Sequence, residues 1–339
     1  MSSPRTIKLA DIAKEAGVSI ATASKVMNGR PDVSEVTRAK VERIMRKTGY
    51  SKSLANSTPG KSIEVILEKI DSVWTLEVLQ GVSDMAQRHG LSITLTLTGS
   101  FDNDDHSWIY GTLERRPAGV IYVLLGRTEH DKTMLATRNI PFVTLDSRGD
   151  ASPDEISLRA DNWTGGLIAT RHLLSLGHTR IGVICGPADM TCALARYNGY
   201  LSALEEAGLP VDPSLKRTGN YTEKDGKELA LSLLKSPAKR PTAIFAGDDL
   251  QAMGVYEAAR QLGLSIPEDL SVMGFDNIRT SAYLGPALTT VEQPISLMAQ
   301  RAVETILDIR AGREVEHQAI FSTKLIKRDS TAAPQNHKS

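Results

Sequence analysis

From Ile63 onward the sequence alternates short apolar runs with longer amphipathic stretches, and this alternation leaves few folds open to the chain. The run Ile63–Leu67 precedes a helical pattern at Leu76–Gln87, which leads into a second run at Leu91–Thr98. Short apolar runs bounded by turn residues predict buried strands. Strands separated by helices predict parallel sheets with helices on both faces.

The same alternation continues almost to the C-terminus. The further predicted strands are Val120–Leu124, Pro141–Leu145, Arg180–Cys185, Ala243–Phe245, Leu270–Phe275 and Ala319–Ile326. The predicted helices include Ser107–Arg116, Gly165–Leu176, Cys192–Ala207, Glu223–Leu234, Asp249–Leu262 and Pro294–Gly312. Roughly ten strand-and-helix units are too many for one ordinary sheet. The sequence therefore predicts a core of two doubly wound α/β lobes.

The first 50 residues have a different pattern, with three short helices and a glycine turn between the first two. Apolar residues recur at helical spacing over Leu9–Ala16, and Gly17 supplies the turn. A second helix follows over Ile20–Asn28, with Ser19 as its N-cap, and a third begins at Ser34. The expected buried faces are Ala23, Val26 and Met27 on the second helix and Val41, Ile44 and Met45 on the third. This arrangement is typical of a helix-turn-helix, which places its second helix in the major groove of DNA.

Charge is distributed unevenly along the chain. Residues 1–61 contain 12 Lys and Arg against five Asp and Glu, whereas the other 278 residues contain 28 against 35. The neutral total therefore combines a head of net charge +7 with a body of net charge −7. A basic segment at one end favours binding to nucleic acid there.

Several classes of protein are not supported by the sequence. No apolar run approaches the ~18 residues of a membrane span, and the N-terminus lacks the apolar core of a secretory signal. Two cysteines, Cys185 and Cys192, are too few for a disulfide framework, so we expect a cytoplasmic protein without a membrane partner. The histidines lack metal-ligand spacing, and the Ser-x-x-Lys at Ser232–Lys235 has no companion motif. We therefore expect no metal, no cofactor and no enzymatic activity.

Polar residues follow several of the predicted strands, where ligands bind in doubly wound sheets. The residues at these positions are Asp146, Asp248, Asp249, Asp276 and Asn277, with Arg196 early in the helix after another strand. Carboxylates accept hydrogen bonds from hydroxyl groups and a guanidinium donates them, so this set suits a polyhydroxylated ligand. Trp74, Trp163 and Tyr221 could supply flat walls for a sugar ring.

Several stretches of the sequence resemble those of a known family. Residues Thr6–Asn28 and Val33–Val41 are similar to the opening of lactose/galactose-repressor-type regulators. Further matching stretches are His172–Ile181, Arg196 with Gly199, Phe245–Asp249, Ile266–Asp276 and Leu288–Pro294. The resemblance covers residues 6–331, nearly the whole chain.

The resemblance implies a homodimeric, allosteric transcriptional repressor with a periplasmic-binding-protein-like core. The head would comprise residues 1–50 and the hinge residues 51–61. The core N-lobe would comprise residues 62–161 and 291–321, and the C-lobe residues 162–290 and 322–330, followed by a disordered tail at 331–339. A small effector bound between the lobes would control binding to a near-palindromic double-stranded operator.

The resemblance also assigns DNA contacts. Base reading would fall to Ile20, Ala21 and Lys25, with Ser24 and Asn28 nearby, and phosphates would be held by Lys8, Ser19, Ser34 and Thr37. Family hinges usually read Leu-Ala-Arg-Ser-Leu, and their second leucine enters the minor groove. Here Leu54 is retained, but Thr58-Pro59 stands in place of the second leucine. Either Leu54 is the wedge or this protein bends its operator less.

The effector positions of the family correspond here to Asp146, Trp163, Arg196, Tyr221, Asp248 and Asp276. The stretch Arg159–Gly166 is similar to regulators of plant-polysaccharide sugars, which favours xylose or a short β-linked oligosaccharide as an inducer. A purine or another metabolite acting as a corepressor is the main alternative. A carbohydrate-binding protein without DNA function is a second alternative, but it would not need the first 61 residues.

Overall fold

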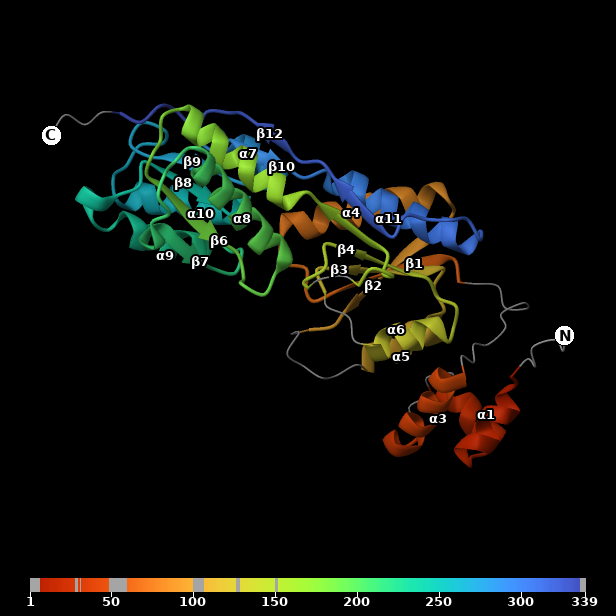
Figure 1. The fold of residues 1–339 in the computed structure, drawn as a ribbon. Coiled ribbons are helices and arrows are strands. Elements are labelled where there is room, and N and C mark those ends of the chain that lie inside the picture. Colours follow the sequence, from red (N-terminus) through yellow and green to blue (C-terminus); the bar gives the residue numbers. More distant parts are fainter. Residues whose placement is uncertain are drawn as a thin grey trace.

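The computed structural model describes residues 7–27, 30, 32–48, 60–99, 107–125, 129–149 and 152–335. These residues form a small helical head and a larger core of two α/β lobes (Figure 1). The fold class predicted from the sequence is therefore confirmed. Within the described residues, no helix is both long and apolar enough to cross a membrane.

The head consists of α1 (Leu9–Ala16), α2 (Ile20–Met27) and α3 (Glu35–Thr48). Gly17 ends α1 in the left-handed conformation, with φ of 65°, which glycine adopts without steric penalty. The hydroxyl of Ser19 accepts a hydrogen bond from the backbone N–H of Thr22 at 3.0 Å and so caps α2. The buried apolar residues of the head are those expected from helical spacing: Ile12, Ala13, Ala16, Ala23, Val26, Met27, Val41, Ile44 and Met45.

The N-lobe is built on a six-stranded parallel sheet with the strand order β11-β5-β4-β3-β1-β2. Its strands are β1 (Ser62–Leu67), β2 (Ser92–Leu97), β3 (Gly119–Val123), β4 (Phe142–Leu145), β5 (Ser157–Ala160) and β11 (Gln318–Phe321). Its helices are α4 (Val73–Arg88), α5 (Ser107–Arg115), α6 (Glu129–Ala136) and α11 (Ile295–Arg310). Apolar residues of α4 and α11 pack on one face of this sheet, and residues of α5 and α6 pack on the other (Figure 1).

The C-lobe is built on a four-stranded parallel sheet with the strand order β7-β6-β8-β9. Its strands are β6 (Ile181–Cys185), β7 (Lys216–Thr218), β8 (Ala243–Ala246) and β9 (Ser271–Met273). Helices α7 (Asn162–Ser175) and α8 (Thr191–Glu206) contribute to one core cluster, and α9 (Glu223–Leu234) and α10 (Asp249–Gln261) to another. The short 3₁₀ segments are η1 (Pro213–Leu215), η2 (Pro237–Lys239) and η3 (Arg279–Tyr283).

Within the described residues, the chain passes between the lobes three times. It enters the C-lobe after β5, returns to the N-lobe after β10 (Thr290–Glu292), and leaves again between β11 and β12 (Lys324–Ile326). β10 and β12 pair with each other in antiparallel orientation. These connections are the segments that would have to bend if one lobe rotated relative to the other.

One predicted strand is wrong. The run Ala319–Ile326 was expected to form a single strand, but β11 ends at Phe321 and β12 begins at Lys324, in a different sheet. The apolar pattern does not show that the first half of a run pairs with one strand and the second half with another. Three short strands, β5, β7 and β10, were not predicted, because segments of three or four residues with polar members do not form an apolar run.

The described part of the expected disordered tail, residues 331–335, begins with ordered contacts. The backbone N–H of Ala332 donates to the Ser271 hydroxyl at 3.0 Å. The carbonyl of Ala332 lies 2.8 Å from Nε2 of His178, and the Thr331 hydroxyl lies 2.9 Å from Nε2 of His172. These contacts attach the segment beside the β9 edge of the C-lobe sheet.

Candidate functional site

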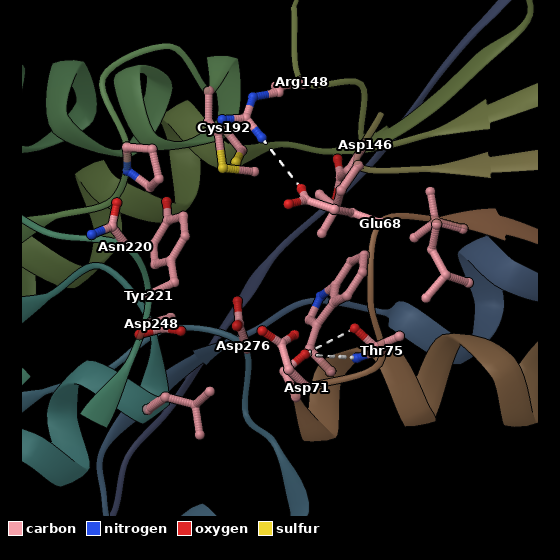
Figure 2. A pocket seen from close by; sticks show the side chains of 18 of the residues that line it. Glu68, Asp71, Thr75, Asp146, Arg148, Cys192, Asn220, Tyr221, Asp248 and Asp276 are labelled. Atoms are coloured by element: carbon pink, nitrogen blue, oxygen red, sulfur yellow. Dashed lines mark hydrogen bonds and ion pairs between the residues drawn. The ribbon is translucent and has the colours of Figure 1, made fainter. Parts of the chain in front are cut away.

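A cavity of about 370 Å³ lies between the two lobes, beyond the carboxyl ends of their strands. Figure 2 shows side chains from both lobes around the same space. The N-lobe contributes Glu68, Asp71, Trp74, Asp146 and Arg148, and the C-lobe contributes Cys192, Arg196, Asn220, Tyr221, Asp248 and Asp276, among others. The cavity has the position and mixed lining of a small-molecule site.

The structure brings together five of the six residues predicted to bind the effector. Asp146, Arg196, Tyr221, Asp248 and Asp276 all line this cavity, which we call the main pocket. The sixth does not line it. Trp163 lies in the first turn of α7 and lines a smaller cavity next to the main pocket.

Arg196 is the central cation of the main pocket. Its Nε donates to Oδ1 of Asn162 at 2.8 Å, and its Nη1 donates to the Gly247 carbonyl at 2.5 Å. Its Nη2 lies 3.4 Å from Oδ1 of Asp276, and the guanidinium stacks 3.8 Å from the centre of the Phe275 ring. Burial alone would lower the pKa of Arg196, but the surrounding acidic groups raise it, so the side chain stays charged.

The buried carboxyl groups of the pocket are shifted toward their neutral form. Burial raises the pKa of Asp146 to about 6, against the opposing attraction of Arg196. Burial raises the pKa of Asp276 to about 6 as well, although Arg196 and the amide of Gln293 lower it. The pKa of Asp248 lies well above its ordinary value because of burial and the nearby charge of Asp276. The pocket thus holds more acidic groups than its one buried guanidinium balances.

Several pocket residues have a positive backbone φ angle, which residues other than glycine rarely adopt. Leu124, Asp146, Tyr221 and Asp276 have φ of 54°, 47°, 60° and 106°. Such conformations are unfavourable and tend to occur at functional sites, where surrounding structure holds them. The position of the Tyr221 ring also depends on Gly186, because a Cβ atom on residue 186 would lie 2.0 Å from Cζ of the tyrosine ring.

Contacts across the cleft hold the lobes together near the pocket. Nε of Arg148, on the N-lobe loop after β4, donates to Oδ2 of Asp189 in the C-lobe at 2.7 Å. The Thr191 N–H and hydroxyl donate to the carbonyls of Arg148 and Ser147 at 3.1 Å and 3.0 Å. Arg148 also lies 3.7 Å from Glu68 (Figure 2). The pocket is therefore bounded by direct lobe-to-lobe contacts.

Sequence reasoning missed several lining residues. The strand-end rule could have found Glu68, which directly follows β1, and Arg148, which lies in the loop after β4. Cys192, Asn220 and Gln293 carry no comparable signal. Cys192 lies at the start of α8, and the other two follow β7 and β10, the short strands that form no apolar run in the sequence. Among the described residues, no group of three or more His, Cys, Asp or Glu side chains could hold a metal ion.

The head presents the residues predicted to read bases. Ile20 is 56% exposed, and Ala21 and Lys25 are also exposed, on the side of α2 away from the head core. Nζ of Lys25 lies 2.5 Å from Oδ2 of Asp32, and this pairing lowers the pKa of Asp32. Ser24 on the same helix is half-buried. Two further predicted DNA contacts, Asn28 and Leu54, lie outside the described residues.

The residues predicted to hold phosphates lie at helix starts. Lys8 precedes α1, Ser19 precedes α2, and Ser34 precedes α3. The Ser34 hydroxyl accepts from the Thr37 N–H at 3.4 Å and donates to the Thr37 hydroxyl at 2.9 Å. Backbone N–H groups at helix N-termini favour anions, which suits contacts with DNA phosphates.

Comparison with protein families gives two matches. Residues 8–53 match a model described as bacterial regulatory proteins, lacI family. Residues 170–331 match a model described as a periplasmic binding protein-like domain. The first match spans the head, and the second falls almost entirely within the C-lobe and α11.

Curated relatives are similar over nearly the full length. The HTH-type transcriptional repressor PurR of Proteus mirabilis (strain HI4320) is 36% identical over 338 residues, covering 96% of this chain and 97% of the relative. The protein of the same name from Photorhabdus laumondii subsp. laumondii is 35% identical over 336 residues, covering 96% of each chain.

Solved structures are similar in fold across head and core. A complex of the transcriptional regulator CelR with cellobiose has a TM-score of 0.74 and 28% identity, covering 96% of this chain and 99% of that one. The lac repressor dimer bound to operator and the anti-inducer ONPF has a TM-score of 0.72 and 26% identity, covering 97% of this chain and all of that one.

Proposed function

The chain belongs to the lacI family of bacterial regulatory proteins, and we propose that a small sugar bound between its lobes controls its release from an operator. It is a DNA-binding transcriptional repressor of that family. Xylose and short β-linked oligosaccharides are the proposed effectors. The proposal concerns the ligand, the residues that bind it and the direction of its effect.

The observation that carries the proposal is the set of buried carboxyl groups around one guanidinium. Asp146, Asp248 and Asp276 all line the main pocket with Arg196. Sugar hydroxyls donate hydrogen bonds to carboxyl oxygens, and each such bond compensates in part for the burial of a polar group. Trp74 and Tyr221 add flat apolar surfaces on two sides of the same cavity. The similar structure of CelR contains cellobiose, a sugar of the proposed class.

A purine corepressor remains the second candidate because the curated relatives carry the name PurR. A purine would also use carboxylates as acceptors for its N–H groups and aromatic walls for its ring. It would act in the opposite direction, because a corepressor strengthens operator binding and an inducer weakens it. The direction of the ligand effect therefore separates the two candidates.

The DNA-binding side of the proposal places α2 in the major groove. Lys25 would donate to guanine O6 or N7, and Ile20 and Ala21 would contact thymine methyl groups. Two heads of a homodimer would bind half-sites about one helical turn apart. Exposed apolar side chains on the N-lobe support a dimer contact there, namely Leu76 on α4 and Leu95 and Leu97 on the edge strand β2.

Coupling between the two sites would run through the lobe-to-lobe contacts. Effector bound in the cleft favours one relative position of the lobes, which changes how the two N-lobes, and with them the heads, are spaced. A coupling free energy of about 1–3 kcal/mol is sufficient for a 5- to 150-fold change in operator affinity. The hinge residues that would transmit this change, 51–59, lie outside the described residues.

The test begins by selecting bound fragments from genomic DNA with the full-length protein. Mobility shifts on the selected operator are then measured at fixed salt with xylose, cellobiose, hypoxanthine or guanine. Weaker binding with a sugar supports the proposal, and stronger binding with a purine replaces it with the second candidate. If no genomic fragment is preferred over random competitor DNA, with or without these ligands, the proposed operator function fails.

A further inference from the structure

A second cavity, of about 180 Å³, lies beside the main pocket at the crossover between the lobes. The N-lobe contributes Ser147, Arg159 and Ile320 to its walls, and the C-lobe contributes Trp163 and Thr191. Two further residues, Asp146 and Cys192, line both cavities. A ligand here would contact both lobes and would lie next to the main pocket. We call this cavity the Trp163 pocket.

The indole of Trp163 is available as a flat surface on a fixed backbone. Trp163 is 44% exposed, although large apolar residues such as tryptophan are usually more buried. Its backbone is held where α7 and α8 pack closely, since a Cβ on Gly199 would lie 2.1 Å from the Trp163 carbonyl oxygen. Asp161 caps the same helix by accepting from the Thr164 N–H at 3.0 Å. The indole therefore projects from a rigid helix start.

Polar groups stand around this surface. Within the described ranges, no hydrogen bond or ion pair engages the exposed guanidinium of Arg159, which lies on β5. Asp146 also lines this cavity, and the charge of Arg159 opposes in part the rise in the pKa of the Asp146 carboxyl. Thr191 and Ser147 also line the cavity, and the Thr191 hydroxyl donates to the Ser147 carbonyl at 3.0 Å. A cavity lined by one aromatic residue together with arginine, aspartate, serine and threonine suits a ring that is apolar on its faces and hydroxylated at its rim.

We propose that the Trp163 pocket is a second sugar subsite, which holds one sugar ring against the Trp163 indole. The inference rests on the sugar effector proposed above and extends it. Its volume is about half that of the main pocket, which suits a single ring. The ring is either the second unit of an oligosaccharide that begins in the main pocket or a separate monosaccharide. In both cases the subsite makes effector binding depend on sugar length or number.

The test is calorimetric titration of the full-length protein with xylose, xylobiose, glucose and cellobiose. Wild type is compared with Trp163→Ala and Trp163→Phe. Leu194→Ala is the matched control, because Leu194 is a 54% exposed apolar residue of α8 that lines neither cavity. Circular dichroism and melting temperature establish that each variant is folded.

For a spanning disaccharide, we expect Trp163→Ala to weaken xylobiose or cellobiose binding about tenfold, the scale of one aromatic contact, and to leave the monosaccharide unchanged. For a separate ring, we expect the monosaccharide stoichiometry to fall from two per chain to one. Trp163→Phe retains most of the wild-type behaviour, and Leu194→Ala retains all of it.

The inference is overturned if Trp163→Ala binds every sugar with wild-type affinity and stoichiometry, or weakens all of them equally. In that case the proposed sugar effector still stands, because wild type binds sugar in the main pocket. If wild type binds none of the four sugars, the proposed effector class fails and the subsite fails with it. The two failures are therefore distinguishable within one set of titrations.

Discussion

Replacing Asp146 with Asn is expected to stabilise the ligand-free protein at neutral and alkaline pH. Burial raises the pKa of this carboxyl from 3.8 to about 6. Ionising it in the folded state above pH 6 therefore costs about 3 kcal/mol relative to the unfolded chain, at about 1.4 kcal/mol per pKa unit. Asn is neutral at every pH and carries no such cost. Asn also tolerates the left-handed backbone at this position, where φ is 47°, so the substitution adds no strain.

The gain should depend on pH in a defined direction. Below about pH 4 the Asp146 side chain is protonated in both the folded and the unfolded states, so its titration contributes no difference. As pH rises from about 4 to about 6, the unfolded chain releases this proton first, and the wild type loses stability relative to Asp146→Asn. Above pH 6 the difference reaches its full value of about 3 kcal/mol, which corresponds to about 5–10 °C in melting temperature for a core of this size.

Differential scanning calorimetry of both proteins at pH 4, 6 and 8 without ligand measures this difference in the core transition. Asp189→Asn is the control, because that carboxyl is 60% exposed and paired with Arg148, and it should give no gain at pH 8. This prediction is refuted if Asp146→Asn gains the same melting temperature at all three pH values, or if it is less stable than the wild type at pH 8. Either result would mean that burying the ionised Asp146 carboxylate does not destabilise the protein.

Four further outcomes are expected. Lys25→Ala should lose about 1–3 kcal/mol of operator affinity at fixed salt and relax one base position; unchanged binding in a mobility shift would contradict the placement of α2 in the groove. Asp32→Asn should release Lys25 from its ion pair, so operator affinity at fixed salt should rise. Unchanged operator binding in a mobility shift would show that this ion pair does not compete with the contact between Lys25 and guanine. Arg148→Ala should loosen the lobes, because it removes the bonds to Asp189 and Glu68; small-angle scattering should then report a larger radius of gyration, and an identical scattering curve would show that these bonds do not hold the cleft. Sugar affinity should fall about tenfold per carboxylate between pH 7 and pH 5, because the groups with pKa of about 6 lose the charge that accepts hydroxyl hydrogen bonds; titrations that agree at the two pH values would exclude Asp146 and Asp276 as ionised acceptors.

Local sequence patterns were enough to predict the structure of the head in detail. The spacing of apolar residues in three short helices predicted each member of the buried cluster, because helical periodicity is a local property of about four residues. Gly17 and Ser19 identified the turn and the cap for the same reason. The alternation of strands and helices likewise predicted two α/β lobes, and the strand-end rule found the carboxylates that meet around Arg196.

Which residues line the same cavity could be learned only from the tertiary structure. Trp163 and Tyr221 were equivalent candidates in the sequence, yet they line different cavities because the chain crosses between lobes at Asp161 and turns the first residues of α7 to the other side of Asp146. The division of the run Ala319–Ile326 between two sheets has the same origin, since pairing partners lie more than 30 residues away in the sequence. The raised pKa values of Asp146 and Asp276 also depend on burial, which only packing of the whole chain produces.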